Sequence, residues 1–423
     1  MKSKYLAALL TMAAGLTIST EAVATVVVEW QQGDNAANIQ QAIDSGDSEI
    51  IIPDVDKTWV VGQPIVADQP HQKIIFKPGV VVKAKEGAFK GKTDSLLNVQ
   101  ADNVTLSGYG ATLKMQKDDY DNPNLYKPSQ FRHNIKIRGA RNFVVEGLVL
   151  RDSGGDGILI THGLHEKNSV PERKFSSGIV RDVIANNNYR QGISVVSAKD
   201  LLVENSTFKN TSGVKPSAGV DIEPDHDWQK LVNIQFKNNK FINNNRHGIQ
   251  IALGKYHGSN VSNVSINFDG CKSIDNQEYG IKIQGNNPGV NAGKGVKGKI
   301  TFKDCVVRNS GEHGIWMRND QLDPSQTYKV TFENTKVIDA AQKAGEFYPV
   351  LLWNTVQPGG IHNIDFGNDF LIVDNKKRPA LHTNFLAKKH GLSNISGVIK
   401  VNNSLQQPTD LGENLTNVTL QIK

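Results

Sequence analysis

Short runs in which apolar and polar residues alternate recur along the chain, and each run is followed by a turn rich in Asn, Gly or Ser. Residues 142–160 read "NFVVEGLVLRDSGGDGILI", and residues 265–283 read "SINFDGCKSIDNQEYGIKI". Alternation with period two is typical of β-strands. No helical periodicity lies between the strands, which excludes a βαβ protein, and the turns are spaced too widely for a hairpin sandwich.

The same segment repeats at a nearly constant interval. A turn glycine followed by a short β-branched strand recurs after 35, 27, 29, 32 and 34 residues. These glycines are Gly157, Gly192, Gly219, Gly248, Gly280 and Gly314. A repeat of this length, with three short strands and polar corners, predicts coils that stack on one another as a solenoid.

The repeats "GDGILI", "RQGISV", "AGVDIE", "RHGIQI", "EYGIKI" and "EHGIWM", with "NVTLSGYGATL" upstream, resemble those of pectin-lyase-like carbohydrate-active enzymes. The resemblance covers most of residues 35–420. It implies an all-β fold, a single-stranded right-handed parallel β-helix. The segment "NAANIQQAIDSGDSEIIIPD" is similar to the helix that caps the first coil in such proteins. A cap would cover the apolar core and the strand edge at the open end.

The first 24 residues have the layout of a signal peptide. Lys2 and Lys4 precede an apolar run, and "AVA" at 22–24 fits a cleavage site. We therefore expect a leader over 1–24, a single β-helix domain over 25–423 and a secreted or periplasmic protein. We expect a monomer that does not insert into a membrane.

Charge and composition point to the class of partner. Lys and Arg total 48 against 42 Asp and Glu, a net charge of +6. This excess fits an acidic polysaccharide or oligosaccharide, or a basic surface that only aids solubility. We expect no nucleic-acid partner. The 38 glycines suit a turn-rich β protein, and two cysteines are too few for a disulfide scaffold.

Stacking the coils predicts two outward-facing columns, each made of residues at one position of successive coils. The first column is Lys136, Leu159, Ser194, Asp221, Gln250, Lys282, Trp316 and Leu351. The second is Arg138, Thr161, Val196, Glu223, Ala252, Gln284, Arg318 and Trp353. Acids lie at the centre, cations on both flanks and exposed aromatics on the C-terminal side. This pattern suits a groove for sugar rings, against the alternative of a solvated face.

Asp221 and Glu223 are the central candidates, because they face the same way about 6.5 to 7 Å apart on one strand. They could be the acid and base of an inverting glycosidase. With Asp225, they could instead bind Ca²⁺ that neutralises a uronate. The D-x-E pair is similar to the E-x-D pair of iota-carrageenases.

A lyase would need further groups, and the next coils supply candidates. Tyr279, Lys282 or His247 would be the base, and Arg246 or Arg318 would bind the carboxylate. "RHG" at 246–248 resembles β-helix lyases of the chondroitinase B and alginate lyase type, which implies a role for Arg246 in elimination. The lysine motif of those lyases and the polygalacturonase set "NTD", "DD", "GHG", "RIK" are absent in their usual form.

The remaining candidates would bind substrate along the groove. They are Lys136, Arg138, Asp156, Arg190, Gln250, His313, Trp316, Arg318 and Trp353. Asp156 could instead be a plain turn residue, and the turn histidines could be structural. The first choice of function is a lyase acting on a uronate polysaccharide by β-elimination. The alternatives are the inverting hydrolase and a non-catalytic glycan-binding solenoid.

Two long insertions and the two cysteines also allow predictions about the structure. The insertions 162–175 and 285–298 are expected to border the groove, because long loops on a rigid stack build the walls of sites. Cys271 and Cys305 occupy the same position in successive coils. They are expected to be stacked thiols in the core, or else a disulfide that the exported location would allow.

Overall fold

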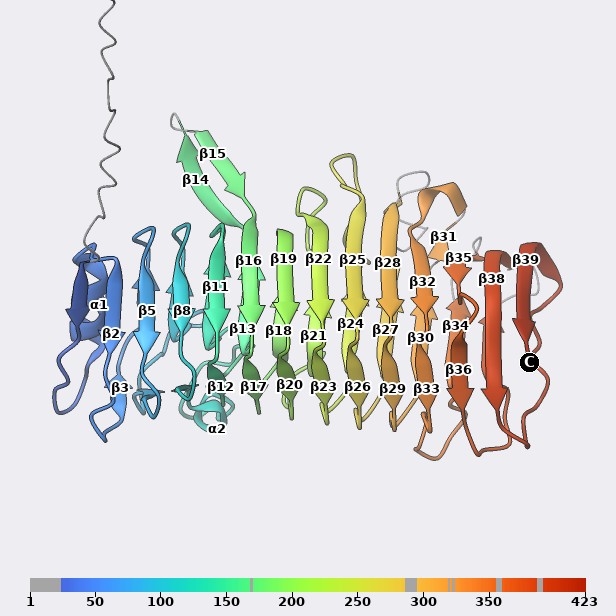
Figure 1. Ribbon diagram of the computed structural model, residues 1–423, viewed down its shortest axis with the longest axis horizontal. Helices are drawn as coiled ribbons and strands as arrows, with labels where there is room; N and C mark the ends of the chain where they lie inside the picture. Colours follow the sequence, from blue (N-terminus) through green and yellow to red (C-terminus); the bar gives the residue numbers. More distant parts are fainter. Residues whose placement is uncertain are drawn as a thin grey trace, which may run out of the picture.

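The computed structural model describes residues 24–167, 170–285, 295–318, 320–321, 324–354, 360–385 and 391–423. Its coils stack side by side along one long axis, from β1 at one end to β39 at the other (Figure 1). The predicted signal peptide and most of the loop 285–298 lie outside the described residues.

Each coil contributes one strand to an 11-stranded parallel sheet, here called the site sheet. Its strands, in order along the axis, are β4 (Ile65–Ala67), β7 (Leu97–Val99), β10 (Ile135–Arg138), β13 (Ile158–Thr161), β18 (Gln191–Val195), β21 (Ala218–Ile222), β24 (Ile249–Ala252), β27 (Ile281–Gln284), β30 (Ile315–Arg318), β34 (Val350–Asn354) and β37 (Leu381–Phe385).

Apart from one hairpin described below, the other strands of the described residues form two further parallel ladders that meet at one long strand, β38 (Gly391–Asn402). One ladder contains β1 (Thr25–Val27), β2 (Glu49–Ile52), β5 (Lys73–Phe76), β8 (Thr105–Ser107), β11 (Phe143–Glu146), β16 (Ser176–Arg181), β19 (Ala198–Glu204), β22 (Leu231–Lys237), β25 (Val264–Asp269), β28 (Gly298–Lys303), β32 (Lys329–Glu333), β35 (Gly360–Asp365) and β39 (Asn414–Ile422), with β31 (Asp320–Gln321) antiparallel to β35. The other contains β3 (Trp59–Val61), β6 (Val81–Ala84), β9 (Thr112–Lys114), β12 (Val149–Arg151), β17 (Ile184–Asn186), β20 (Thr207–Lys209), β23 (Lys240–Ile242), β26 (Lys272–Ile274), β29 (Val306–Arg308), β33 (Lys336–Ile338) and β36 (Phe370–Val373).

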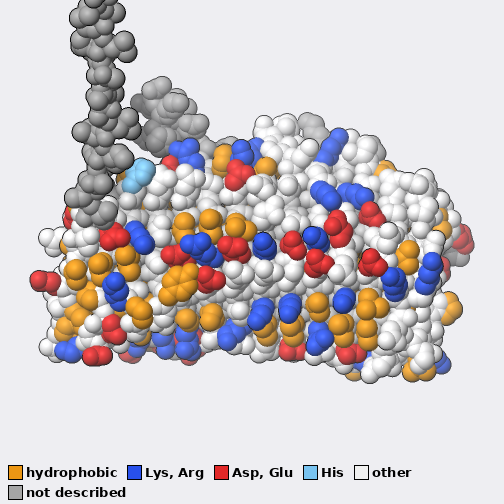
Figure 2. Space-filling view, in the orientation of Figure 1, with side chains coloured by type: hydrophobic (Ala, Val, Ile, Leu, Met, Phe, Trp, Pro, Cys, Tyr) orange, Lys and Arg blue, Asp and Glu red, His pale blue; other side chains and the backbone are white. Residues whose placement is uncertain are grey.

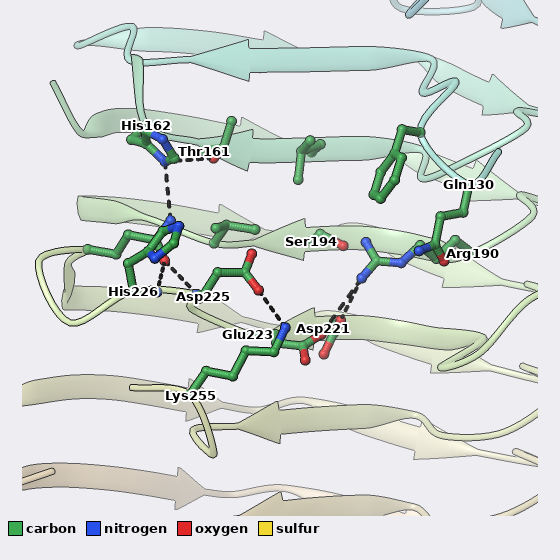
Figure 3. A pocket seen from close by; sticks show the side chains of 14 residues that line it. Gln130, Thr161, His162, Arg190, Ser194, Asp221, Glu223, Asp225, His226 and Lys255 are labelled. Atoms are coloured by element: carbon green, nitrogen blue, oxygen red, sulfur yellow. Dashed lines mark hydrogen bonds and ion pairs between the residues drawn. The ribbon is translucent and has the colours of Figure 1, made fainter. Parts of the chain in front are cut away.

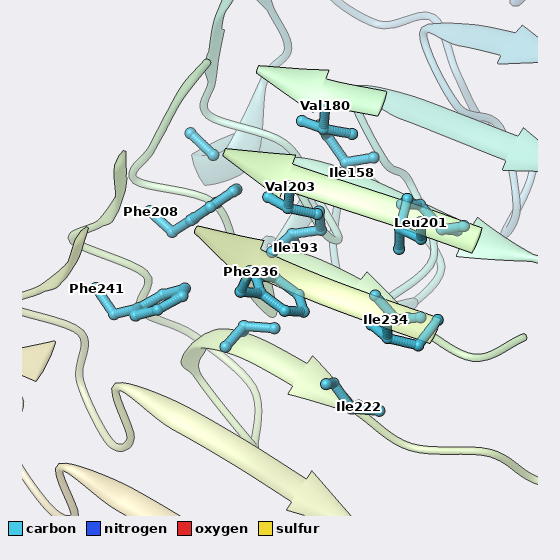
Figure 4. Close-up of a cluster of buried hydrophobic side chains, with 14 of the residues drawn as sticks. Ile158, Val180, Ile193, Leu201, Val203, Phe208, Ile222, Ile234, Phe236 and Phe241 are labelled. Atoms are coloured by element: carbon cyan, nitrogen blue, oxygen red, sulfur yellow. The ribbon is translucent and has the colours of Figure 1, made fainter. Parts of the chain in front are cut away.

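Alternation along each strand builds the core inside the coils. Inward residues such as Ile193 and Ile222 are fully buried, and phenylalanines stack from coil to coil (Figure 4). Phe236 and Phe268 lie 4.8 Å apart between ring centroids, and Phe268 and Phe302 lie 5.0 Å apart, with nearly parallel planes. Each coil therefore packs against its neighbours, as stacked repeats require.

Charged and polar side chains also form columns on the outside, and rows of both signs run along the face in Figure 2. One column alternates strictly in charge through paired positions of neighbouring strands. Its members are Glu146, Arg181, Glu204, Lys237, Asp269, Lys303 and Glu333. Opposite charges at directly paired positions stabilise the register of a sheet.

The corners explain the abundance of asparagine. Asn187, Asn210, Asn243 and Asn309 all have φ between 51° and 57°, a left-handed conformation that asparagine tolerates. Asn243 donates to the side chain of Asn210 over 2.9 Å, so these corners are also bonded from coil to coil.

Two α-helices and one short 3-10 helix, η1 (Pro324–Gln326), accompany the solenoid in the described residues. α1 (Ala36–Asp44) buries Ile39 and Ile43 against the first coils at the position predicted for a helix. Its role as a cap stays a prediction. α2 (Lys117–Tyr120) is a single turn. Neither of them has the length and apolar character needed to cross a bilayer. The insertion 162–175 contains an antiparallel hairpin, β14 (Gly163–Lys167) with β15 (Val170–Lys174).

Candidate active site on the outer face of the site sheet

The first predicted column is present throughout the register of the site sheet, and of the second column the pairs Arg138–Thr161, Ala252–Gln284 and Gln284–Arg318 are present. Lys136, Leu159, Ser194, Asp221, Gln250, Lys282, Trp316 and Leu351 are paired in succession from β10 to β34. A cavity of about 280 Å³ opens on β13, β18 and β21 (Figure 3). Asp221 and Glu223 lie in its wall, together with Arg190.

Arg190 is the centre of a carboxylate cluster. Its Nη2 lies 3.8 Å from Oδ2 of Asp221 and 3.7 Å from Oε2 of Glu223. Its Nη1 lies 3.6 Å from Oδ2 of Asp156. The sequence suggested Arg190 and Asp156 as substrate-binding residues, and the structure brings both of them into contact distance within this cluster. One guanidinium thus offsets part of the repulsion among three carboxylates.

Asp221 is held by two glutamines and has an unusual protonation equilibrium. Gln191 donates to its Oδ2 over 3.0 Å, and Gln250 donates to its Oδ1 over 2.9 Å. The side chain is only 1% exposed. Burial and the Glu223 carboxylate raise the pKa of Asp221 to about 7, against the opposing effects of Arg190 and Gln250. At neutral pH this carboxyl group carries a proton for much of the time.

Asp156 is fully buried two strands away, and its backbone N–H donates to Nδ1 of His133 over 2.9 Å. Because Nδ1 accepts that bond, it has no proton to give to the carboxylate 3.3 Å away. Burial raises the pKa of Asp156 to about 6, although Arg190 opposes the shift. Asp156 therefore belongs to the carboxylate cluster around Arg190. Because it is buried, it does not line the cavity as Asp221 and Glu223 do.

Glu223 and Asp225 differ from Asp221 in exposure and partners. The Glu223 side chain is 30% exposed at the mouth of the cavity. Asp225 is turned toward Lys255, whose Nζ lies 2.7 Å from its Oδ1. Among the described residues, no three His, Cys, Asp or Glu side chains converge as metal ligands. With Asp225 paired to a lysine and Asp221 bonded to two amides, these three acids do not fit the predicted calcium site.

His162 and His226 line the cavity on the side away from Arg190 (Figure 3), and Trp228 packs against both of them. His226 and Trp228 stack with ring centroids 5.4 Å apart, and His162 meets Trp228 edge to face at 4.5 Å. Gln229 lies 3.2 Å from Nδ1 of His162 and accepts hydrogen bonds from the backbone of 225 and 226. Phe131, which is 42% exposed, lies at the rim. It offers a flat apolar face on which a sugar ring can stack.

The other predicted catalytic residues form a second cluster, with Lys282 on β27 and with Arg246, His247 and Tyr279 in the turns that precede β24 and β27. Arg246 is bound to Glu278, with Nε 2.6 Å from Oε1. His247 is buried, and burial lowers its pKa well below the usual value. Its ring stacks on Tyr279, whose own pKa burial raises to about 12. Lys282 donates to Gln250 over 3.1 Å, and this bond connects the second cluster to Asp221.

The predicted exposed aromatic surface on the C-terminal side is wrong for Trp316, which is only 4% exposed. Its ring lies against Tyr279, Trp353 and the ammonium of Lys282. Trp353 is half-buried, and Arg318 has a partner of its own within the structure. His313 is buried and accepts from the backbone N–H of 348, and burial lowers its pKa to about 4.

Sequence reasoning missed several residues of the cavity. Lys255, His162 and Gln229 come from segments between the repeats, and Phe131 comes from the segment before β10. Only His162 lies in an insertion expected to border the groove. Gln191 occupies the position of Asp156 in the next coil, and this register was the one signal that could have identified it.

Comparison with known proteins decides the handedness of the coils. Residues 124–291 match the family model described as "Right handed beta helix region". The fold is a right-handed parallel β-helix. This confirms the resemblance noted in the sequence. The chain is also 24% identical over 246 residues to the uncharacterized protein YclG of Bacillus subtilis, a match that covers 56% of this chain. The chain spans little more than a third, 37%, of that curated relative.

Solved structures share this β-helix at low sequence identity. The family 28 exopolygalacturonase of Yersinia enterocolitica has a TM-score of 0.59 at 13% identity, covering 94% of this chain and 78% of its own. The tailspike of E. coli bacteriophage HK620, solved with a pentasaccharide, has a TM-score of 0.58 at 11% identity, with coverages of 92% and 75%. A mannuronan C-5 epimerase module of Azotobacter vinelandii has a TM-score of 0.50 at 14% identity, with coverages of 92% and 96%.

Proposed function

We propose that the protein is an exported enzyme that hydrolyses glycosidic bonds of a polysaccharide, with Asp221 as the acid and Glu223 as the base. The observation that carries the proposal is the contrast between these two carboxyl groups in one cavity. Asp221 is buried with a pKa raised to about 7, whereas Glu223 is open to solvent beside Arg190. Two carboxyls whose environments differ in this way suit acid and base roles.

The chemistry follows from the positions of the two groups. Asp221 gives its proton to the glycosidic oxygen as the bond from that oxygen to the anomeric carbon breaks. Glu223 takes a proton from a water molecule, whose oxygen bonds to the anomeric carbon. Because both carboxylates contact Nη2 of Arg190, their nearest oxygens are separated by at most the sum of 3.8 and 3.7 Å. That upper bound reaches the lower end of the separation of about 6.5–9.5 Å in inverting glycosidases, and it also admits the separation of about 5–5.5 Å in retaining ones.

Arg190 is a positioning residue in this scheme. Its charge favours ionised carboxylates, so it keeps the pKa of Asp221 from rising further. The exopolygalacturonase, the epimerase and the pentasaccharide-bound tailspike share the fold and, by their descriptions, concern saccharides. This supports a saccharide as the substrate class. The chemistry rests on the residues of the cavity.

A lyase acting on an acidic polysaccharide by β-elimination is the second candidate. Burial lowers the pKa of Lys282, which favours the free amine as a base. It would take the proton α to a uronate carboxylate while the glycosidic oxygen leaves. Tyr279 and His247 are poorer bases, because the pKa of Tyr279 is about 12 and His247 is enclosed. Lys282 is also bonded to Gln250, next to the cavity that holds Asp221.

A screen of polysaccharides with two readouts tests the proposal. Hydrolysis produces new reducing ends without near-ultraviolet absorbance, whereas β-elimination produces an absorbing double bond. We expect reducing ends alone, and their loss in Asp221→Asn. Absorbing products would support the lyase. Binding without either product would support a glycan-binding solenoid.

A further inference from the structure

Among the described residues that line the cavity, the two cations Arg190 and Lys255 are both paired with carboxylates. Arg190 lies within 4 Å of Asp156, Asp221 and Glu223. Lys255 is held by Asp225 over 2.7 Å. The cations of the cavity are therefore already paired with its acids. A carboxylate or sulfate brought into the cavity would be repelled by these acids. An uncharged sugar ring, stacked on aromatic faces such as Phe131, meets no such repulsion.

One strand beyond the cavity wall, on β10, two cations lie without a carboxylate partner among the described residues. Leu159 and Thr161 of β13 line the cavity, and they pair with Lys136 and Arg138 of β10. Neither cation has a hydrogen bond or ion pair to a carboxylate within the part of the chain that the structure describes. Arg138 is exposed and Lys136 is half-buried. Both side chains project from the same face of the strand, about 6.5 to 7 Å apart.

Neighbouring charges do not compensate these two cations. Asp102, near this end of the groove, is shared by Arg141 at 2.9 Å and Lys174 at 2.6 Å. Burial and the charge of Arg138 lower the pKa of Lys136, as expected for a cation without an acid beside it. An anion bound between Lys136 and Arg138 would relieve this repulsion.

We propose that Lys136 and Arg138 form a subsite for an anionic sugar residue, while the cavity at Asp221 and Glu223 accepts an uncharged one. The inference rests on the proposed function, because that function places the cleaved bond at Asp221 and Glu223 and so fixes the position of the subsite relative to that bond. Three strand spacings separate β10 from β21, or about 14 Å. The substrate class is thus a heteropolysaccharide in which a charged residue stands at a fixed distance from the neutral residue at the cleaved bond.

Binding to an inactive protein tests the subsite without requiring turnover. The parent is Asp221→Asn, and the probes are polygalacturonate, dextran sulfate and uncharged dextran. We expect Lys136→Gln/Arg138→Gln in this parent to weaken binding of at least one anionic probe by tenfold or more and to leave dextran unaffected. Which probe responds distinguishes a carboxylate subsite from a sulfate subsite.

A matched pair controls for total charge. Lys240 and Lys272 are exposed and paired in register on β23 and β26, away from the site sheet. Lys240→Gln/Lys272→Gln should bind the anionic probes as the parent does. Glu223→Gln in the parent should tighten polygalacturonate binding, because it removes an acid from the cavity.

Three results would overturn the inference: no binding of either anionic probe by the parent, equal binding by the Lys136/Arg138 variant, or an equal loss in the control pair. A failure of hydrolysis alone would refute the proposed function, and these binding results would be unaffected.

Discussion

Gln250 donates a hydrogen bond from Nε2 to Oδ1 of Asp221 over 2.9 Å. Its orientation is fixed from the other side, because its Oε1 accepts from the ammonium of Lys282 over 3.1 Å. The amide therefore always presents N–H to the carboxylate, and it favours the ionised form of Asp221. Lys282, which the sequence suggested as a base, acts here on the acid through Gln250.

This relationship predicts a shift of the pH profile in Gln250→Leu. Loss of the donor raises the pKa of Asp221 above about 7. Since the acid works in its protonated form, activity should persist to higher pH. The basic limb of the kcat/KM profile should move to higher pH by about one pH unit. Gln235→Leu, on β22 in a different ladder from the site sheet, is the control and should leave the limb in place. An unmoved limb in Gln250→Leu would contradict the role of the amide.

The raised pKa of Asp156 predicts that the free energy of unfolding depends on pH. Its pKa in the folded protein is about 6, above the value of about 3.9 in an unfolded chain. Between these values the folded state holds the extra proton, so the contribution of Asp156 to stability falls as pH rises from 4 to 6. The free energy of unfolding of Asp156→Asn relative to the natural protein should rise over this range, by on the order of 2 kcal/mol.

Denaturant unfolding at pH 4 and pH 7 measures this difference. The exposed Asp68→Asn is the matched control and should show a smaller change with pH. An Asp156→Asn difference that is the same at both pH values would show that folding does not raise the pKa of Asp156.

Much of the site follows from the sequence because the repeat fixes the register. The position of each turn glycine places Asp221 beside Ser194 and Gln250, and these pairings are present in the structure. Exposure could not be predicted in the same way. Trp316 is outward-facing by register, yet Tyr279, Lys282 and Trp353 cover it. Large neighbours within a column bury one another, and strand alternation carries no information about this.

The missing members of the site have a related cause. Lys255 neutralises Asp225 from a segment between two coils, and the path of such segments is not set by the repeat. The calcium prediction counted the acids and not their partners, and it stays a prediction that removal of metal can test.

Removal of metal tests whether Asp221, Glu223 and Asp225 bind a calcium ion that activity requires. We expect full activity in EDTA or EGTA, because Asp225 is paired with Lys255 and Asp221 accepts two amide hydrogen bonds. Activity is measured before and after dialysis against chelator, and again after calcium is added back. Loss in chelator with recovery in calcium would restore the metal-binding interpretation.

Cys271 and Cys305 are free and buried at neighbouring positions of adjacent coils. Each Sγ bonds to a backbone carbonyl, of Phe236 and Phe268 respectively, over 3.4 Å. We expect no thiol to react with an aromatic disulfide reagent in the folded protein and two to react after denaturation without reductant. Finding none after denaturation would show a disulfide between the coils.

Asp221 and Glu223 are proposed to carry out the cleavage, and the turnover of their isosteric variants tests this proposal. Turnover of a polysaccharide cleaved by the natural protein is measured for Asp221→Asn and Glu223→Gln, with thermal unfolding as the check on folding. Each variant should lose at least about two orders of magnitude in kcat, the scale of a general acid or base, while its Tm is retained. Near-normal turnover in both variants would contradict the proposal.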